Sequence, residues 1–223
     1  MNKEDYDELY HCLRHASNTC TQEEQSTIRG LVNHLLAGGD YLSLIQYSAM
    51  YGEKFLVQPV FDIMISRNII PKRIVEFGAG LGWLSRGLAL KYGISNTLTI
   101  DKRPWAGINI CADLETQKGR SDVLIQMNPG DIIVMSDFLH CVSNPEEIIE
   151  DFSHWPIVAI EYSTANVRYN QSYMEQIGRY GAFPRNEQEL LKLFPAKTYY
   201  HYLFHYLVIV YIPERGENIW VNL

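Results

Sequence analysis

A segment with three glycines in five residues limits most strongly what this chain can fold into. Gly78, Gly80 and Gly82 follow an apolar run at residues 73–77 and precede a helical pattern at residues 81–92. Glycines tolerate positive φ and let a ligand approach the backbone, and the helix behind them presents unpaired N–H groups with a partial positive charge. A strand, a glycine loop and a helix in this order predict the cofactor-binding turn of an α/β fold.

Beyond residue 71, short apolar runs alternate with helical stretches. Such alternation is typical of a parallel sheet with helices on both faces. The last two apolar runs, 197–203 and 207–212, are too close together for a helical crossover, so we expect a tight turn between them and an antiparallel edge strand. The other expected strands are 73–77, 97–100, 108–111, 131–135 and 157–161, and the expected helices are 81–92, 145–152 and 187–193.

The first 70 residues have helical patterns only. Apolar residues recur there at spacings of three and four, and Gly38-Gly39, Gly52 and Pro71 interrupt the pattern. We therefore divide the chain into a helical cap or lid at residues 1–70 and an α/β domain at residues 71–223.

The acids around the glycine loop distinguish between two adenosine cofactors. Asp101 ends the next expected strand, 21 residues after Gly80, where a carboxylate binds both ribose hydroxyls of an adenosine. The dinucleotide pattern G-x-G-x-x-G needs its third glycine where Trp83 stands, and a carboxylate at Glu76 would repel a pyrophosphate. A cationic adenosyl ligand suits these residues better. A nucleotide-dependent oxidoreductase is the alternative enzyme class.

Residues 76–82 resemble the E/D-x-G-x-G-x-G motif of class I S-adenosylmethionine-dependent methyltransferases. The resemblance covers residues 73–212. Residues 97–101 match the second strand with its ribose-binding acid, and residues 131–137 match the fourth strand. His-x-x-x-x-Pro-Glu at residues 140–146 resembles the start of the next helix in small-molecule methyltransferases. The resemblance implies a Rossmann-like α/β fold with a seven-stranded, mostly parallel sheet, an antiparallel terminal hairpin and an N-terminal helical cap.

The same resemblance implies a set of site residues and no metal. Its cofactor is S-adenosylmethionine, and its acceptor is a small molecule. Tyr51, Phe138 and Tyr162 are expected to line the acceptor pocket. Apart from the resemblance, the polar stretch after residue 164 brings Arg168, Arg179 and Arg185, and an arginine there is a candidate to hold an acidic substrate; a solvated connection is the alternative. Cofactor contacts are expected from Glu76, Gly78, Ala79, Gly80, Gly82, Trp83, Asp101, Lys102, Asp113, Ser136 and Asp137.

His140 is the leading candidate for a general base. Methyl transfer from a sulfonium is an in-line displacement, so the protein mainly aligns the two groups, but a hydroxyl acceptor also needs a base. His140 follows the fourth strand, at the edge where open α/β sheets bind ligands, and an imidazole titrates near neutral pH. A packing or helix-capping histidine is the alternative interpretation.

The predicted function is transfer of a methyl group to an O, N or C atom of a small molecule. A non-catalytic cofactor-binding or scaffold protein is the alternative. The chain has 26 acidic and 19 basic residues, which argues against nucleic acid as a partner. Methylation of protein or tRNA is also disfavoured, because Ser-Asp-Phe-Leu at residues 136–139 stands where an N/D-P-P-Y/F motif would follow the fourth strand. We expect a cytoplasmic protein without a membrane span, because there is no long apolar run, no signal-peptide pattern and no C-x-x-C. A homodimer through the N-terminal helices stays open.

Overall fold

A computed structural model of the chain describes residues 56–80, 82–104, 107–162, 185–195, 198–203 and 206–213; the side chains of Trp83 and Tyr162 are not described. No helix in these ranges is both long and apolar enough to cross a lipid bilayer. The helices are α4 (Gln58–Ser66), α5 (Trp83–Tyr92), α6 (Gln117–Leu124), the 3₁₀ helix η2 (Leu139–Cys141), α7 (Pro145–Asp151) and α9 (Glu187–Lys192). The strands are β1 (Arg73–Phe77), β2 (Thr97–Asp101), β3 (Ile110–Cys111), β4 (Asp131–Ser136), β5 (Ile157–Tyr162), β6 (Thr198–Leu203) and β7 (Tyr206–Tyr211).

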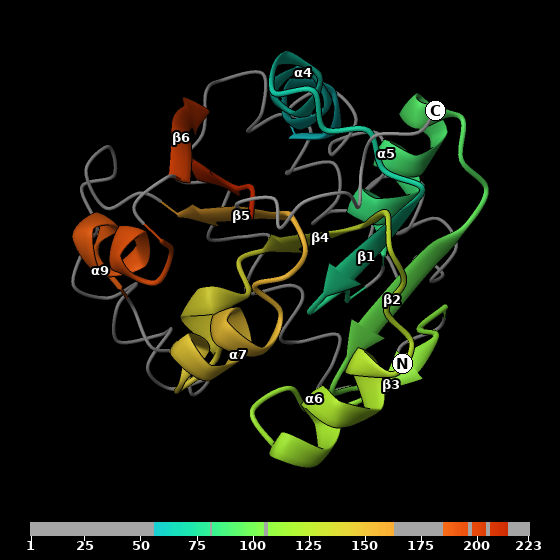
Figure 1. Ribbon diagram of the computed structural model, residues 1–223, viewed down its shortest axis with the longest axis vertical. Helices are drawn as coiled ribbons and strands as arrows, with labels where there is room; N and C mark the ends of the chain where they lie inside the picture. Colours follow the sequence, from blue (N-terminus) through green and yellow to red (C-terminus); the bar gives the residue numbers. More distant parts are fainter. Residues whose placement is uncertain are drawn as a thin grey trace, which may run out of the picture.

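The strands form one seven-stranded sheet in the order β3-β2-β1-β4-β5-β7-β6 (Figure 1). Strands β1 to β5 are parallel, and β7 runs antiparallel to both β5 and β6. The predicted mostly parallel sheet with a terminal hairpin is confirmed. The expected antiparallel edge strand is also confirmed, since β6 forms the edge of the sheet and pairs antiparallel with β7.

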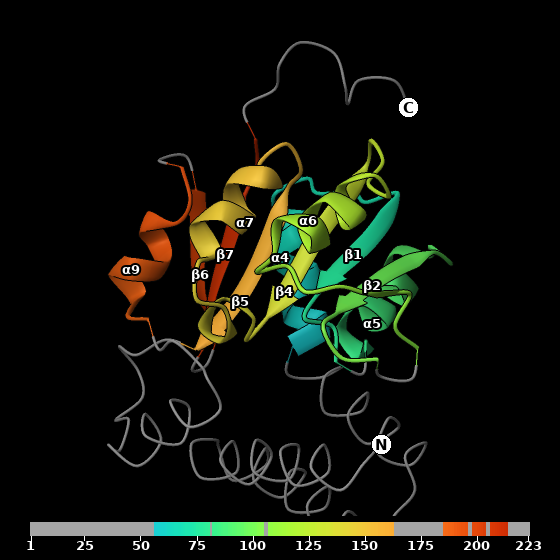
Figure 2. The ribbon, with the colours of Figure 1, turned by 90° about the horizontal axis from the view of Figure 1, so that it is seen from below.

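Alternation along the strands divides the core into two layers, one on each face of the sheet. In β1, Ile74 joins the cluster that contains α4 and α5, whereas Val75 and Phe77 join the cluster that contains α6, α7 and α9. Figure 2 shows α6, α7 and α9 in a row across one face. All the carboxyl ends of the parallel strands therefore meet at one edge, between these two layers of helices.

Helix α4 belongs to the same core as the sheet, although it precedes residue 71. Val60 and Met64 are fully buried in the cluster with Ile74 and Leu88. Of the predicted cap, residues 1–55 lie outside the described residues, so the division of the chain at residue 70 stays a prediction.

Helix α6 was not predicted, because its sequence Gln-Lys-Gly-Arg-Ser-Asp-Val-Leu lacks an apolar stripe. Its first turn is held by a cap, since the side chain of Thr116 accepts a hydrogen bond from the amide of Gly119. A Cβ atom at position 119 would lie 2.0 Å from the carbonyl oxygen of Asp113. This close approach brings α6 against the loop that follows β3.

A buried ion pair connects β1 and β4 and gives a test of this core. Arg73 donates from Nε and Nη2 to the two carboxylate oxygens of Asp131, at 3.0 and 2.5 Å, and the Asp131 side chain is only 2% exposed. Replacing Asp131 by Asn leaves the guanidinium without a countercharge, so we expect the free energy of unfolding in urea to fall by about 3 kcal/mol.

Asp122→Asn is the matched control. This substitution breaks the ion pair with Lys118, in which the side chain of Lys118 is 85% exposed and that of Asp122 is 46% exposed. It should change the free energy of unfolding by less than about 0.5 kcal/mol. Equal losses in the two variants would contradict a structural role for the buried pair.

Candidate cofactor and acceptor site

The three glycines after β1 all adopt positive φ, but their surroundings differ. A Cβ atom at Gly78 would lie 2.6 Å from the ring of Phe138, and one at Gly82 would lie 2.9 Å from the guanidinium of Arg86. At Gly80, with φ of +51°, a Cβ atom would meet no described atom within 4 Å. Gly80 is thus where the loop faces open space.

Asp101 places a carboxylate at this open side. Its Oδ2 accepts a hydrogen bond from the amide of Gly80 and its Oδ1 accepts one from the amide of Arg103, both at 2.9 Å. Each carboxylate oxygen has a second lone pair. The arrangement fits an adenosine, since those lone pairs can accept from ribose hydroxyls beside the exposed face of Gly80.

Glu76 faces the helix behind the loop. Its side chain is 4% exposed, and its Oε2 accepts a hydrogen bond at 3.0 Å from the amide of Ser85 in the first turn of α5. Gly82, the N-cap residue, has no side chain to do this. Burial raises the pKa of Glu76 to about 7, against the lowering effect of the Ser85 hydrogen bonds and Arg86. Its carboxylate therefore serves as the cap of α5, and its predicted contact with the cofactor stays a prediction.

The other predicted cofactor residues lie around the same edge. Lys102 and Asp113 are exposed, Ala79 is buried in the loop, and Ser136 is half-buried at the end of β4. Phe138 packs on Gly78 and contacts Phe77 edge-to-face, with ring centroids 6.2 Å apart. The predicted contacts of Tyr51, and of the side chains of Trp83 and Tyr162, fall outside the described structure.

Glu161 holds the loop after β4 and was missed as a site residue. It is the penultimate residue of β5 and is fully buried, and its Oε1 accepts hydrogen bonds from the amides of Phe138 and Leu139 at 3.0 and 2.8 Å. Burial, followed by the charge of Asp137, raises the pKa of Glu161 well above its usual value. A lone acid at the end of the apolar run 157–160 was the signal that could have found it.

His140 lies directly beside Glu161. The imidazole Nδ1 accepts a hydrogen bond at 3.1 Å from the amide of Arg185, and Nε2 lies 3.7 Å from Oε2 of Glu161. Because Nδ1 accepts, the neutral ring has its proton on Nε2, which faces the carboxyl group of Glu161. The residue is 9% exposed, and both ring nitrogens face protein groups.

Arg185 is one of the three arginines considered for an acidic substrate, and the other two, Arg168 and Arg179, lie outside the described residues. The guanidinium of Arg185 donates to the carbonyl oxygens of Leu139 and Ser143, on either side of His140. These bonds, together with the amide bond to the imidazole, fix the loop that contains the candidate base.

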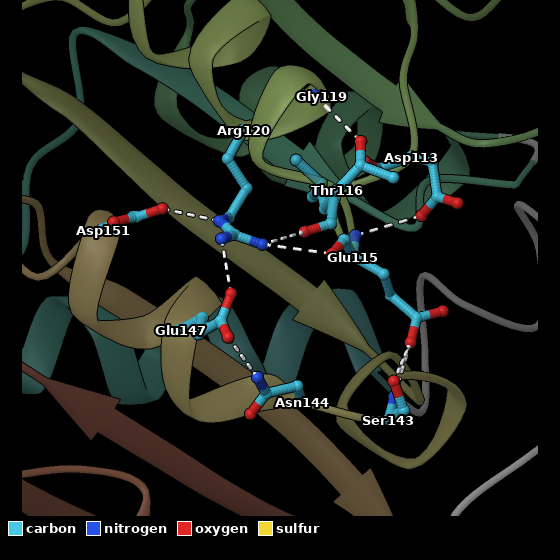
Figure 3. Close-up of polar contacts among 10 residues, drawn as sticks. Asp113, Glu115, Thr116, Gly119, Arg120, Ser143, Asn144, Glu147 and Asp151 are labelled. Atoms are coloured by element: carbon cyan, nitrogen blue, oxygen red, sulfur yellow. Dashed lines mark hydrogen bonds and ion pairs between the residues drawn. The ribbon is translucent and has the colours of Figure 1, made fainter.

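A polar network connects the loop that contains Asp113 to helix α7 and to Ser143, which follows His140 in the chain (Figure 3). Arg120 is 8% exposed, and it forms ion pairs with Glu147 and Asp151 of α7 while donating to the carbonyls of Leu114 and Glu115. The carboxylate of Glu115 accepts from the amide and hydroxyl of Ser143, which lowers its pKa. These partners are far apart in sequence, so no spacing pattern predicted them.

No group of three His, Cys, Asp or Glu side chains in the described part of the chain is arranged to hold a metal ion.

No protein-family model and no curated protein sequence matches the chain, but solved structures do. An O-methyltransferase family protein from Burkholderia thailandensis superposes with a TM-score of 0.56 at 10% identity, over 79% of this chain and 61% of that one. A putative methyltransferase of Haloferax volcanii, in complex with the activator Trm112, gives 0.50 at 11% identity over 77% and 95%. The chain has the fold of the class I S-adenosylmethionine-dependent methyltransferases. The predicted fold is confirmed, and the chain spans about three fifths of the length of the Burkholderia protein.

The pKa of Glu76 gives a prediction for this site. The folded state favours the protonated carboxyl, since the pKa is about 7 against an ordinary 4.5, so wild-type stability falls as the pH rises from 4.5 through 7. Glu76→Gln keeps an acceptor for the amide of Ser85 but does not titrate. We expect the free energy of unfolding of the variant, relative to wild type, to rise by about 3 kcal/mol from pH ~4.5 to pH ~8.

Urea denaturation of both proteins at several pH values measures this difference, in which all other titrating groups cancel. A difference that does not change with pH would contradict the buried, protonated state of Glu76.

Proposed function

We propose that this chain transfers a methyl group from S-adenosylmethionine to a small-molecule acceptor. One observation supports this best: the exposed face of Gly80 lies beside the carboxylate of Asp101, at the carboxyl edge of β1 and β2, in a class I methyltransferase fold. Ligands of open α/β sheets bind outside this edge.

In this proposal the adenosine lies along β1 and β2. Asp101 accepts from the ribose hydroxyls, Asp113 binds the adenine amino group, and Lys102 and Ser136 border the ligand. When bound, S-adenosylmethionine supplies a methyl group that is already activated on a sulfonium. The acids at this edge make the site negative, which favours a positively charged donor over a pyrophosphate.

His140 is the proposed base, and Glu161 is its positioning residue. Taking a proton at Nδ1 requires the acceptor to replace the amide of Arg185 as the partner of that nitrogen. The resulting imidazolium would then be stabilised by the carboxylate oxygen of Glu161, 3.7 Å from Nε2. S-adenosylmethionine would supply the methyl group and leave as S-adenosylhomocysteine, and His140 would take the proton that the acceptor loses.

The sequence left two alternatives, a nucleotide-dependent oxidoreductase and a non-catalytic cofactor-binding protein, and the site geometry bears on each of them. A dinucleotide-dependent oxidoreductase would need its pyrophosphate at the N-terminus of α5, where Glu76 already provides a carboxylate. A non-catalytic cofactor-binding protein is favoured by one observation, namely that both ring nitrogens of His140 face protein groups. Turnover separates it from the methyltransferase.

Gly80→Asp tests the cofactor site. Aspartate tolerates positive φ better than most residues, so the loop should fold while the new carboxymethyl group occupies the open side. We expect calorimetry to show at least a ~10-fold loss of affinity for S-adenosylmethionine, with an unchanged circular dichroism spectrum.

Gly93→Asp is the matched control, because Gly93 also has positive φ and open space but lies at the far end of α5. It should leave the affinity unchanged. Equal affinities in the two variants, or binding of NADH in place of S-adenosylmethionine by the wild type, would refute the assignment.

His140→Ala tests catalysis. With an acceptor identified by a +14 mass product, we expect kcat to fall by about 100-fold or more while the affinity for S-adenosylmethionine changes less than about two-fold. Production of S-adenosylhomocysteine measures the rate. An unchanged kcat would remove His140 as the base, and a wild type that binds the cofactor but methylates nothing would favour the non-catalytic alternative.

A further inference from the structure

Asp137 occupies an unusual position at the end of β4. Its φ is +51°, a conformation that among the described non-glycine residues only Asn68 shares. The amide of Asp137 donates to the carbonyl oxygen of Ile160 in β5, which fixes this turn of the chain. Non-glycine residues in such conformations concentrate at functional sites.

Asp137 and Glu161 each have one unused acceptor, and the bond of Asp137 to Ile160 brings the two residues close; Asp137 is half-buried and Glu161 is fully buried. Oδ1 of Asp137 and Oε2 of Glu161 are both buried and have no hydrogen-bond partner among the described residues. Burial raises the pKa of Asp137 to about 7, and burial, followed by the charge on Asp137, raises the pKa of Glu161. A buried carboxylate oxygen without a donor destabilises a folded protein, unless a ligand supplies the donor.

A ligand that satisfies both oxygens while the two acids are ionised is a donor of hydrogen bonds with positive charge. A sulfonium has no N–H group, and no set of three ligating side chains in the described structure suits a metal ion. A protonated nitrogen supplies both the charge and the N–H groups.

The position of Asp137 and Glu161 in the sheet favours the methyl acceptor, rather than the cofactor, as their ligand. Asp101 ends β2 and Gly80 lies in the loop after β1. Asp137 follows β4 and Glu161 is the penultimate residue of β5, on the other side of the sheet's switch point between β1 and β4. Glu161 also lies against His140, the proposed base.

We propose that Asp137 and Glu161 form an anionic subsite that binds the protonated nitrogen of the methyl acceptor, so that the acceptor is an amine-containing small molecule. The inference rests on the proposed function, since it assigns the acceptor of the same site. The nitrogen held here is an anchor, and the atom that receives the methyl group is a separate question.

Binding of matched probes to the full chain, saturated with S-adenosylhomocysteine, tests the proposal. The probes are a panel of aliphatic and aromatic amines, each paired with the carboxylate of the same skeleton, for example tyramine with 3-(4-hydroxyphenyl)propionate. We expect at least one amine to raise the Tm and to bind in calorimetry, and its carboxylate counterpart to do neither.

Asp137→Asn then tests the residue. Asparagine also tolerates positive φ, so the substitution removes the charge and keeps the turn. We expect at least a ten-fold loss of amine affinity and, without a ligand, a Tm raised by about 2–5 °C at pH ~8, because a buried unpaired charge is gone. A purely structural carboxylate would instead lower the Tm. Glu161→Gln, which keeps an acceptor for the amides of Phe138 and Leu139, should weaken amine binding in the same direction.

A comparison of two nucleosides distinguishes the sources of the cation. S-adenosylhomocysteine contains an amino-acid ammonium group, and 5′-methylthioadenosine lacks it. If Asp137→Asn weakens the first but not the second, Asp137 binds the cofactor and the proposal is wrong. It is also wrong if no amine binds while S-adenosylhomocysteine binds normally, whereas failure of both to bind the wild type would refute the proposed function itself.

Discussion

Carboxylates that accept hydrogen bonds from backbone amides hold the loops at the functional edge of this sheet. Asp101 binds the amides of Gly80 and Arg103, Glu76 binds the amide of Ser85, and Glu161 binds those of Phe138 and Leu139. Loops that connect strands to helices bury few apolar side chains, and a buried amide without a partner costs about 1–3 kcal/mol. The shape of the site therefore depends on ionisable groups, and its stability depends on their state of protonation.

The acids at this edge differ in how many of their carboxyl oxygens already accept hydrogen bonds from the protein. Glu76 is committed to α5, and one oxygen of Glu161 is committed to the loop of η2, whereas Oδ1 of Asp137 has no partner in the described structure. Anchored carboxylates shape the edge, and the unanchored oxygens are left for recognition. Because the raised pKa values of Glu76 and Asp137 both lie near 7, a bound cation would shift these groups toward the charged form.

The sequence predicted the sheet and its glycine loop because both depend on local patterns. Strands β1, β2, β4 and β5 are buried apolar runs, and the loop after β1 contains its own positive-φ glycines. Helix α6 was missed, because Arg120 and a cap at Thr116, rather than an apolar stripe, hold it in place.

The burial of Glu76 was predictable in principle from the alternation along its strand. Residues two apart in a strand share a face, so Glu76 belongs with Ile74 on the face that α5 covers. The hydrogen bonds of Glu161 to amides 22 and 23 residues away have no counterpart in any spacing rule. Such contacts follow from the order of the strands, which the tertiary structure alone reveals.

The three glycines show why a motif does not by itself identify a ligand. Gly78 and Gly82 are required by neighbours in the protein, the ring of Phe138 and the guanidinium of Arg86, and only at Gly80 does the missing Cβ leave open space. The contact at Gly78 has a consequence of its own. Phe138 packs on the loop at its ring and binds Glu161 at its amide, and Glu161 lies against His140, so a single residue connects the proposed cofactor loop to the proposed base. A displacement of that loop would reach the imidazole through three contacts, from Gly78 to Phe138, from Phe138 to Glu161 and from Glu161 to His140.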